Sequence, residues 1–80
     1  VISDGVDRLA ISQSTGDLPD PVLIGVAGDG DEGTALLEIV HDVAPGADLA
    51  FSSGLSSLEF IEAIDFFTEN GVDVIVDDIG

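Results

Sequence analysis

The sequence predicts an α/β fold with three layers, in which helices cover both faces of a mostly parallel sheet. Short apolar runs alternate along the 80 residues with segments whose apolar side chains recur at helical spacing. The resulting order of strands and intervening helices favours parallel strands joined by right-handed crossovers. Because the length allows one small domain, we expect residues 1–80 to belong to a single unit.

Four strands are expected from the apolar runs. Ile2 ends the first strand, and a turn follows it at residues 3–5. Residues 22–27 (VLIGVA) form an uninterrupted apolar run, which is typical of a strand buried on both faces. Residues 48–52 and 72–76 complete the predicted sheet.

Three helices are expected between these strands. The first covers residues 6–13 and the second residues 31–43. The third begins at the capping-box sequence of residues 56–59 (SSLE) and ends at residues 70–71. In the second helix, a spacing of 100° per residue places five apolar side chains on the buried face. They are Ala35, Leu36, Ile39, Val40 and Val43. The third helix should bury Phe60, Ala63, Ile64 and Phe67.

Charge and composition exclude several classes of function. One Lys or Arg stands against 17 Asp and Glu, giving a net charge of −16. Nucleic acid and anionic membrane surfaces are therefore excluded as partners, since both require basic side chains. The chain contains no cysteine, and therefore no disulfide. It begins with Val1, and we expect it to be a piece of a longer protein. The acidity suggests a salt-rich or extracellular, secreted setting.

The glycine-rich loop at residues 28–33 (GDGDEG) matches the G-x-G-x-x-G pattern between a strand and a helix. Its three acidic side chains would repel a pyrophosphate, which argues against a dinucleotide site. Asp29 and Asp31 leave a calcium site open as an alternative, although an EF-hand would need Glu where Val40 stands. We therefore expect no cofactor and no metal, with calcium as the alternative.

Three segments together resemble the subtilisin-like serine peptidases. Residues 32–34 (EGT), the amphipathic helix and residues 43–49 (VAPGADL) are similar to the family's histidine segment, H-G-T, helix, V-A-P-x-A-x-L. Residues 60–80 resemble its next helix and strand, which end in N-G-A-D-V-I-x-x-S-x-G. Residues 1–5 (VISDG) resemble the strand V-x-V-I-D-T-G, which holds the catalytic aspartate. The resemblance covers nearly the whole chain in the right order.

Glu32 stands where the family has its catalytic histidine. Residues 32–46 also resemble the glutamate helix of the sedolisins, E-x-x-L-D-V-E-W-A-H-A-I-A-P-G, but Leu36 replaces the sedolisin aspartate. The resemblance implies peptide-bond hydrolysis through a serine outside this chain, with Asp4 and Glu32 as the acid–base residues. Glu32 has a simpler interpretation as an acid at a helix start, and Asp4 as a turn residue.

The resemblance also assigns a substrate-binding edge. Asp78, Ile79 and Gly80 correspond to S-x-G, whose backbone would bind a peptide or protein substrate as an added strand; a solvated loop is the alternative. His41, the only histidine, is expected to be solvated or structural. Two other classes stay open: a non-catalytic binding or surface module of the same fold, and a nucleotide- or calcium-binding module that uses residues 28–33.

Overall fold

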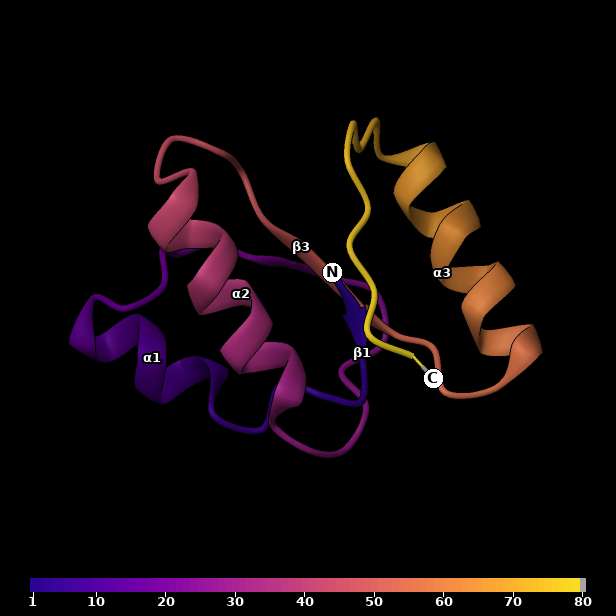
Figure 1. The fold of residues 1–80 in the computed structure, drawn as a ribbon, viewed down its shortest axis with the longest axis horizontal. Helices are drawn as coiled ribbons and strands as arrows, with labels where there is room; N and C mark the ends of the chain where they lie inside the picture. The colour runs from indigo at the N-terminus through magenta and orange to yellow at the C-terminus, as the bar shows by residue number, and fades with distance from the viewer. Residues whose placement is uncertain (80) are drawn as a thin grey trace.

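The computed structural model describes residues 1–79 and contains three helices and a three-stranded sheet (Figure 1). The elements in chain order are β1 (Ile2–Ser3), α1 (Leu9–Thr15), β2 (Leu23–Ile24), α2 (Glu32–Val43), β3 (Ala50–Ser53) and α3 (Ser57–Glu69). The alternation of strands and helices that the sequence predicts is therefore present, although every strand is short.

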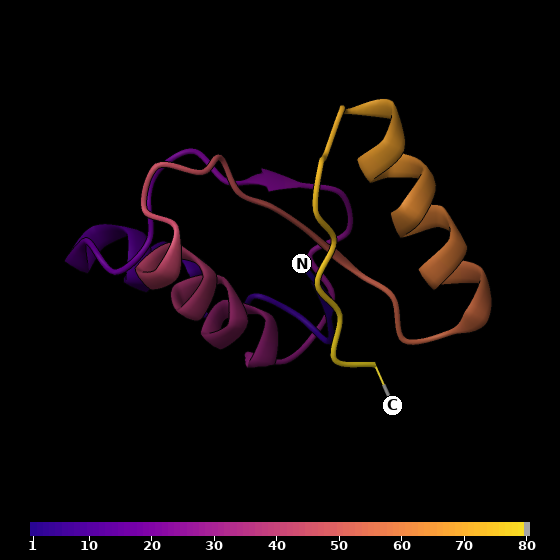
Figure 2. The ribbon, with the colours of Figure 1, turned by 45° about the horizontal axis from the view of Figure 1, so that its top comes forward.

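The sheet is parallel, with β3 in the middle and strand order β1-β3-β2. Ile2 is opposite Ser52 on one side of β3, and Leu23 is opposite Ala50 on the other side. The helices α1 and α2 lie on one face of the sheet and α3 on the other, as Figure 2 shows. The predicted α/β class with a parallel sheet is confirmed.

Two hydrophobic cores separate the layers, because neighbouring residues of a strand point to opposite faces. Phe51 and Leu37, both 0% exposed, belong to the core beneath α1 and α2. Ile2 and Phe67, also 0% exposed, belong to the core beneath α3. The predicted inner face of α3 is confirmed, since Ala63 is buried there and Phe60 and Ile64 pack against the same core.

Local sequence signals fix both ends of α3. The Ser56 hydroxyl accepts a hydrogen bond from the Glu59 amide at 3.1 Å, as a capping box requires. The Glu59 carboxylate reaches back to the amide of Leu55 at 3.3 Å, one residue earlier than the standard pattern. Gly71, with φ of 71°, adopts the left-handed conformation that follows a helix end.

The predicted strand at residues 72–76 is wrong, because this segment forms no strand. The segment 72–79, which we call the C-terminal arm, runs past β1 (Figure 1) and pairs with it at one position only. The Ile2 amide donates to the Val76 carbonyl at 2.8 Å, and the Asp78 amide donates to the Ile2 carbonyl at 3.4 Å. The strand β1 is two residues long, and Ile2 is the one that pairs with the described part of the arm.

The run at residues 22–27 also differs from its prediction. Only Leu23–Ile24 forms a strand, and Leu23 and Val26 are 44% and 54% exposed rather than buried on both faces. The reason is the position of β2 at the edge of the sheet, where β3 is its only neighbour. The helix α2 packs against β1 and β3 and leaves the edge uncovered.

The buried face of α2 is only partly the predicted one, since Leu36 and Val40 do pack against the core beneath α1 and α2. Gly33, Thr34 and Leu37 are buried, whereas Ile39 and Val43 are 58% and 81% exposed. A Cβ atom at Gly33 would overlap with the Gly5 carbonyl oxygen and the Phe51 ring, so this turn of the helix lies directly on the sheet. That contact fixes the rotation of the helix about its axis.

The helix α1 occupies the neighbouring face of α2 and further constrains its rotation. The Ser12 hydroxyl donates to the Glu38 carboxylate at 2.9 Å, which ties the two helices together. His41 is half-buried rather than solvated, and its buried Nδ1 has no hydrogen-bond partner among the described residues. A polar face of α2 is thus used for packing, and part of its apolar face is left at the surface.

Candidate functional site

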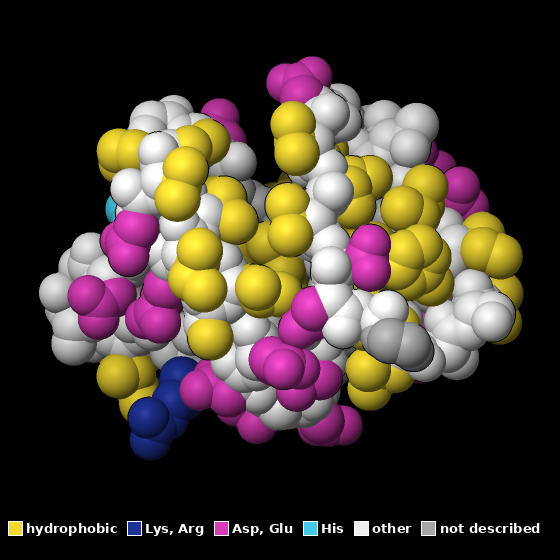
Figure 3. All heavy atoms as spheres, viewed as in Figure 1, with side chains coloured by type: hydrophobic (Ala, Val, Ile, Leu, Met, Phe, Trp, Pro, Cys, Tyr) yellow, Lys and Arg dark blue, Asp and Glu magenta, His cyan; other side chains and the backbone are white. Residues whose placement is uncertain are grey.

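Three carboxylates from distant parts of the sequence lie together at the carboxyl edge of the sheet. Asp4 follows β1, Glu32 is the first residue of α2, and Asp78 lies on the C-terminal arm beside β1. The carboxyl ends of parallel strands share one edge, where sites of α/β proteins gather. Figure 3 shows a group of acidic side chains next to the arm.

Asp4 holds the start of α2. Its Oδ1 accepts hydrogen bonds from the amides of Gly5 at 2.6 Å, Glu32 at 3.0 Å and Gly33 at 3.3 Å. Two of these donors are the unpaired amides of the first turn of α2, where a carboxylate is favourable for both hydrogen bonding and the helix dipole. Asp31, the residue that precedes the helix, makes no cap of its own. Asp4 is therefore more than the turn residue of the simpler interpretation.

The glycine-rich loop is shaped around Asp4. A Cβ atom at Gly30, whose φ is 115°, would overlap with the Asp4 carboxylate. A Cβ atom at Gly28, whose φ is 67°, would overlap with the Asp4 carbonyl oxygen. These two positions need glycine because the Asp4 side chain and backbone approach the loop so closely.

The amides that would have to bind a pyrophosphate are already occupied. Besides the bonds to Asp4 Oδ1, the Asp29 amide donates to the Asp4 carbonyl at 3.1 Å. The Gly30 amide donates to the Asp7 carboxylate at 3.1 Å. A nucleotide would have to displace both acidic residues, which argues against the dinucleotide interpretation of residues 28–33.

Glu32 is exposed and faces two other acids. The charge of Asp78, followed by that of Asp4, raises the pKa of Glu32 above its ordinary value of 4.5. The simpler interpretation of Glu32, an acid at a helix start, accounts for its position but not for its raised pKa.

The predicted substrate edge is brought to this site in part. The charge of Asp78 acts on Glu32, whereas Ile79 packs against the core beneath α3. Gly80 lies outside the described residues. The effect of Asp78 on Glu32 could not be predicted, because the resemblance gave this position a backbone contact only, and the register of the arm against β1 is not visible in the sequence.

Asp7 is a second residue that the sequence did not single out. Its carboxylate supports the glycine-rich loop through the Gly30 amide, and its own amide donates to the Gly30 carbonyl at 2.9 Å. In residues 1–79, no group of three or more side chains is arranged to hold a metal ion. Asp29 and Asp31, the alternative calcium ligands, therefore belong to no such group among these residues.

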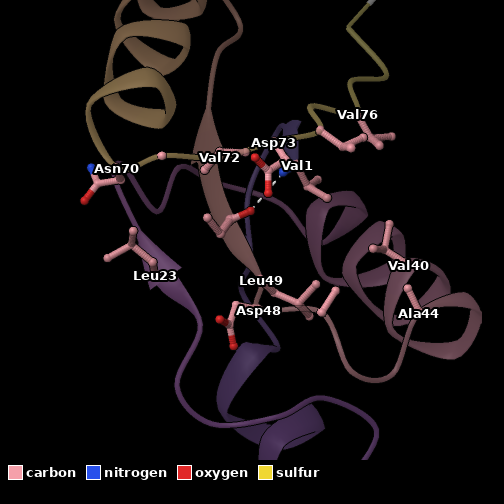
Figure 4. Close-up of a pocket in the computed structure, with 14 residues that line it drawn as sticks. Val1, Leu23, Val40, Ala44, Asp48, Leu49, Asn70, Val72, Asp73 and Val76 are labelled. Atoms are coloured by element: carbon pink, nitrogen blue, oxygen red, sulfur yellow. Dashed lines mark hydrogen bonds between the residues drawn. The ribbon is translucent and has the colours of Figure 1, made fainter.

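A hollow of about 580 Å³ lies at the opposite, amino-terminal end of the strands. Val1, Leu23 and Leu49 line it near the strand starts, and Val40 and Val76 line it from α2 and the arm (Figure 4). The Val1 nitrogen donates to the Ala50 carbonyl there at 2.8 Å. None of the three carboxylates lines this hollow.

No helix in the described part of the chain is long and apolar enough to cross a membrane. Comparison with protein-family models, with curated proteins and with solved structures gave no significant match to this chain.

Proposed function

We propose that this chain forms the N-terminal part of a subtilisin-like serine peptidase domain in which Glu32 replaces the histidine base. The observation that supports this proposal is the convergence of Asp4 and Glu32. The resemblance assigned these two residues to one active site, and the Glu32 amide donates to Asp4 Oδ1 across 28 positions of sequence.

The proposed chemistry is peptide-bond hydrolysis. The Glu32 carboxylate accepts the proton of a serine hydroxyl supplied from outside these 80 residues as that oxygen attacks the peptide carbonyl. The protonated Glu32 then donates this proton to the leaving amine, and an acyl-enzyme remains for water to hydrolyse. Asp4 does not move a proton in this scheme, because its Oδ1 already accepts three amide hydrogens and thereby positions Glu32.

The C-terminal arm is the proposed binding edge for the substrate. The Val76 carbonyl and the Asp78 amide face β1, so the amide and carbonyl of Asp77 point to the opposite edge of the arm. An extended peptide can pair with this free edge as an added strand. A peptide or protein substrate would then lie beside the side chains of Glu32 and Asp78.

The second candidate is a non-catalytic module of the same fold that binds peptides without cleaving them. Asp4 favours it, because the three amides on its Oδ1 give this acid a structural task that needs no reaction. The replacement of the family's histidine by Glu32 points in the same direction.

The deciding experiment measures peptide cleavage from about pH 3 to about pH 8 by a polypeptide that contains this chain and the serine-bearing segment. Glu32→Gln keeps the shape of the side chain but removes the proton acceptor, so turnover should fall by at least about 10²-fold. Glu62→Gln, on the exposed face of α3, removes the same charge and should leave turnover within about twofold.

Two results would oppose the peptidase. Unchanged turnover in Glu32→Gln would reduce Glu32 to a helix-start residue. A wild-type protein that binds peptides but cleaves none at any pH would establish the non-catalytic module instead.

A further inference from the structure

A groove of about 270 Å³ lies between β2 and α3. The strand β2 and the two residues after it form one wall, and the buried Ser52 and Ala63 form the floor. Glu59, Glu62 and Phe66 of α3 form the other wall. The groove is separate from the candidate site, because the C-terminal arm lies beside β1 at one edge of the sheet and β2 lies at the other.

The wall formed by β2 is an open edge of the sheet. Among the described strands, β3 is the only neighbour of β2. The amides of Leu23 and Gly25 donate to the carbonyls of residues 49 and 51, at 3.0 and 2.9 Å. The amide and carbonyl of Ile24, which lies between them, therefore point away from β3. An extended peptide can pair with these two groups as an added strand.

An apolar surface lies beside this free edge. A Cβ atom at Gly25 would be 2.9 Å from the Phe66 ring, so the absence of a side chain allows the half-buried ring to lie close to this backbone. The Val26 amide donates to the Ser52 hydroxyl at 3.1 Å, and the Val26 carbonyl accepts from the Ser53 amide at 2.8 Å. The backbone of Val26 is thus paired, whereas its side chain is 54% exposed. Val26 and Phe66 together offer an apolar surface to the stem of a long side chain.

The charge of the groove selects the kind of peptide. Glu59 and Glu62 are exposed and neighbour each other on α3, three residues apart. Arg8, the only Lys or Arg of the chain, has its Nε 4.0 Å from Asp31 and does not line the groove. A second copy of this chain would bring the same two glutamates and a further net charge of −16, so repulsion opposes it as the occupant. Lys and Arg side chains fit instead, because each combines an apolar stem with a positive head.

We propose that the groove between β2 and α3 binds an extended basic peptide, which adds to β2 as a strand and carries Lys or Arg at alternate positions. Every second side chain of such a strand lies on the α3 face of the sheet. There the stems pack on Val26 and Phe66, and the positive heads pair with Glu59 and Glu62. This inference does not rest on the proposed function, since the proposed substrate edge is the C-terminal arm.

The test is a titration of the isotope-labelled chain with capped peptides, followed by NMR of the backbone amides. The probe is acetyl-Val-Arg-Val-Arg-Val-amide, added up to about 1 mM because a short edge gives a weak interaction. The Ile24 amide signal should shift, and its hydrogen exchange should slow in the complex, because the amide then donates to the peptide. The same peptide with Glu in place of both Arg should cause neither change.

A double variant tests the role of the two glutamates. Glu59→Gln with Glu62→Gln should weaken binding of the arginine peptide about fivefold. Glutamine at residue 59 can still accept from the Leu55 amide, so the start of α3 is retained. The matched control is Glu69→Gln with Asp42→Asn, which removes two charges from exposed positions outside the groove. This control should keep the affinity within about twofold, and circular dichroism should show the wild-type helix content in both variants.

Three results would overturn the proposal. The first is an Ile24 amide that does not respond to the arginine peptide. The second is equal weakening in the double variant and its control, since net charge alone would then explain the binding. The third is slowed exchange at Asp77 in place of Ile24, which would place the peptide on the C-terminal arm and support the proposed substrate edge instead. A response of Ile24 in a protein that cleaves no peptide would retain the groove and reject the peptidase.

Discussion

Gly33 offers the sharpest test of how the site is positioned. A Cβ atom at this residue would overlap with the Gly5 carbonyl oxygen and with the Phe51 ring, whose Cζ would be 3.0 Å away. Neither neighbour can yield easily, because one is backbone beside Asp4 and the other is a ring that is 0% exposed. Gly33→Ala should therefore lift the first turn of α2 from the sheet.

The expected magnitude follows from two opposing effects. Overpacking against rigid neighbours costs up to about 3 kcal/mol. Alanine regains up to about 1 kcal/mol over glycine in a helix. The free energy of unfolding should thus fall by about 2 kcal/mol, which is a substantial part of the stability of a domain this small.

The measurement is urea unfolding followed by helical circular dichroism in about 1 M salt, where charge repulsion is screened. With a slope of about 1 kcal/mol per molar urea, the midpoint should move down by about 2 M. Gly46→Ala is the matched control, because a Cβ atom there meets nothing within 4 Å. Equal midpoints for Gly33→Ala and the wild type would refute the packing of α2 that places Glu32 beside Asp4.

Two further predictions concern charge. Since one basic residue opposes 17 acids, repulsion among the acids should destabilise the chain. Salt screens this repulsion, so helical circular dichroism at neutral pH should rise between about 0.1 M and about 1 M salt. Spectra that do not change would contradict this prediction. The raised pKa of Glu32 means that the folded chain binds its proton more tightly than the unfolded chain. The stabilisation from Glu32 is therefore full below its ordinary pKa and is lost as the pH rises through the raised value. The unfolding midpoint of Glu32→Gln should lack this contribution. The difference in midpoint between the wild type and the variant should therefore change with pH across that window. A difference that stays constant would contradict the raised pKa of Glu32.

The ends of α3 could be predicted because their signals are local. The hydroxyl of Ser56 and the carboxylate of Glu59 bond to amides within four residues, so their spacing in the sequence is sufficient. Gly71 likewise ends α3 through its own backbone conformation. The alternation of strands and helices, and the proximity of Asp4 to Glu32, followed from the order of the elements and from the resemblance.

The sequence could not determine which face of α2 is buried. Its apolar residues allow a buried stripe through Ile39 and Val43, and periodicity alone favours that choice. The contact of Gly33 with Phe51, and the bond between Ser12 and Glu38, shift the buried stripe, which keeps Leu36 and Val40 but leaves Ile39 and Val43 exposed. These are contacts between distant segments, and they outweigh a preference that depends on one helix alone.

The surroundings of Glu32 were also decided by tertiary structure. The apolar pattern of residues 72–76 predicted a strand, but Ile2 is the one residue of β1 that pairs with the described part of the arm. That single pairing sets the register of the arm, and the charge of Asp78 acts on Glu32. The sequence by itself determined which acids the chain possesses and where α3 begins and ends. Only the fold determined which acids lie near Glu32, because Asp4 and Asp78 are distant from it in the sequence.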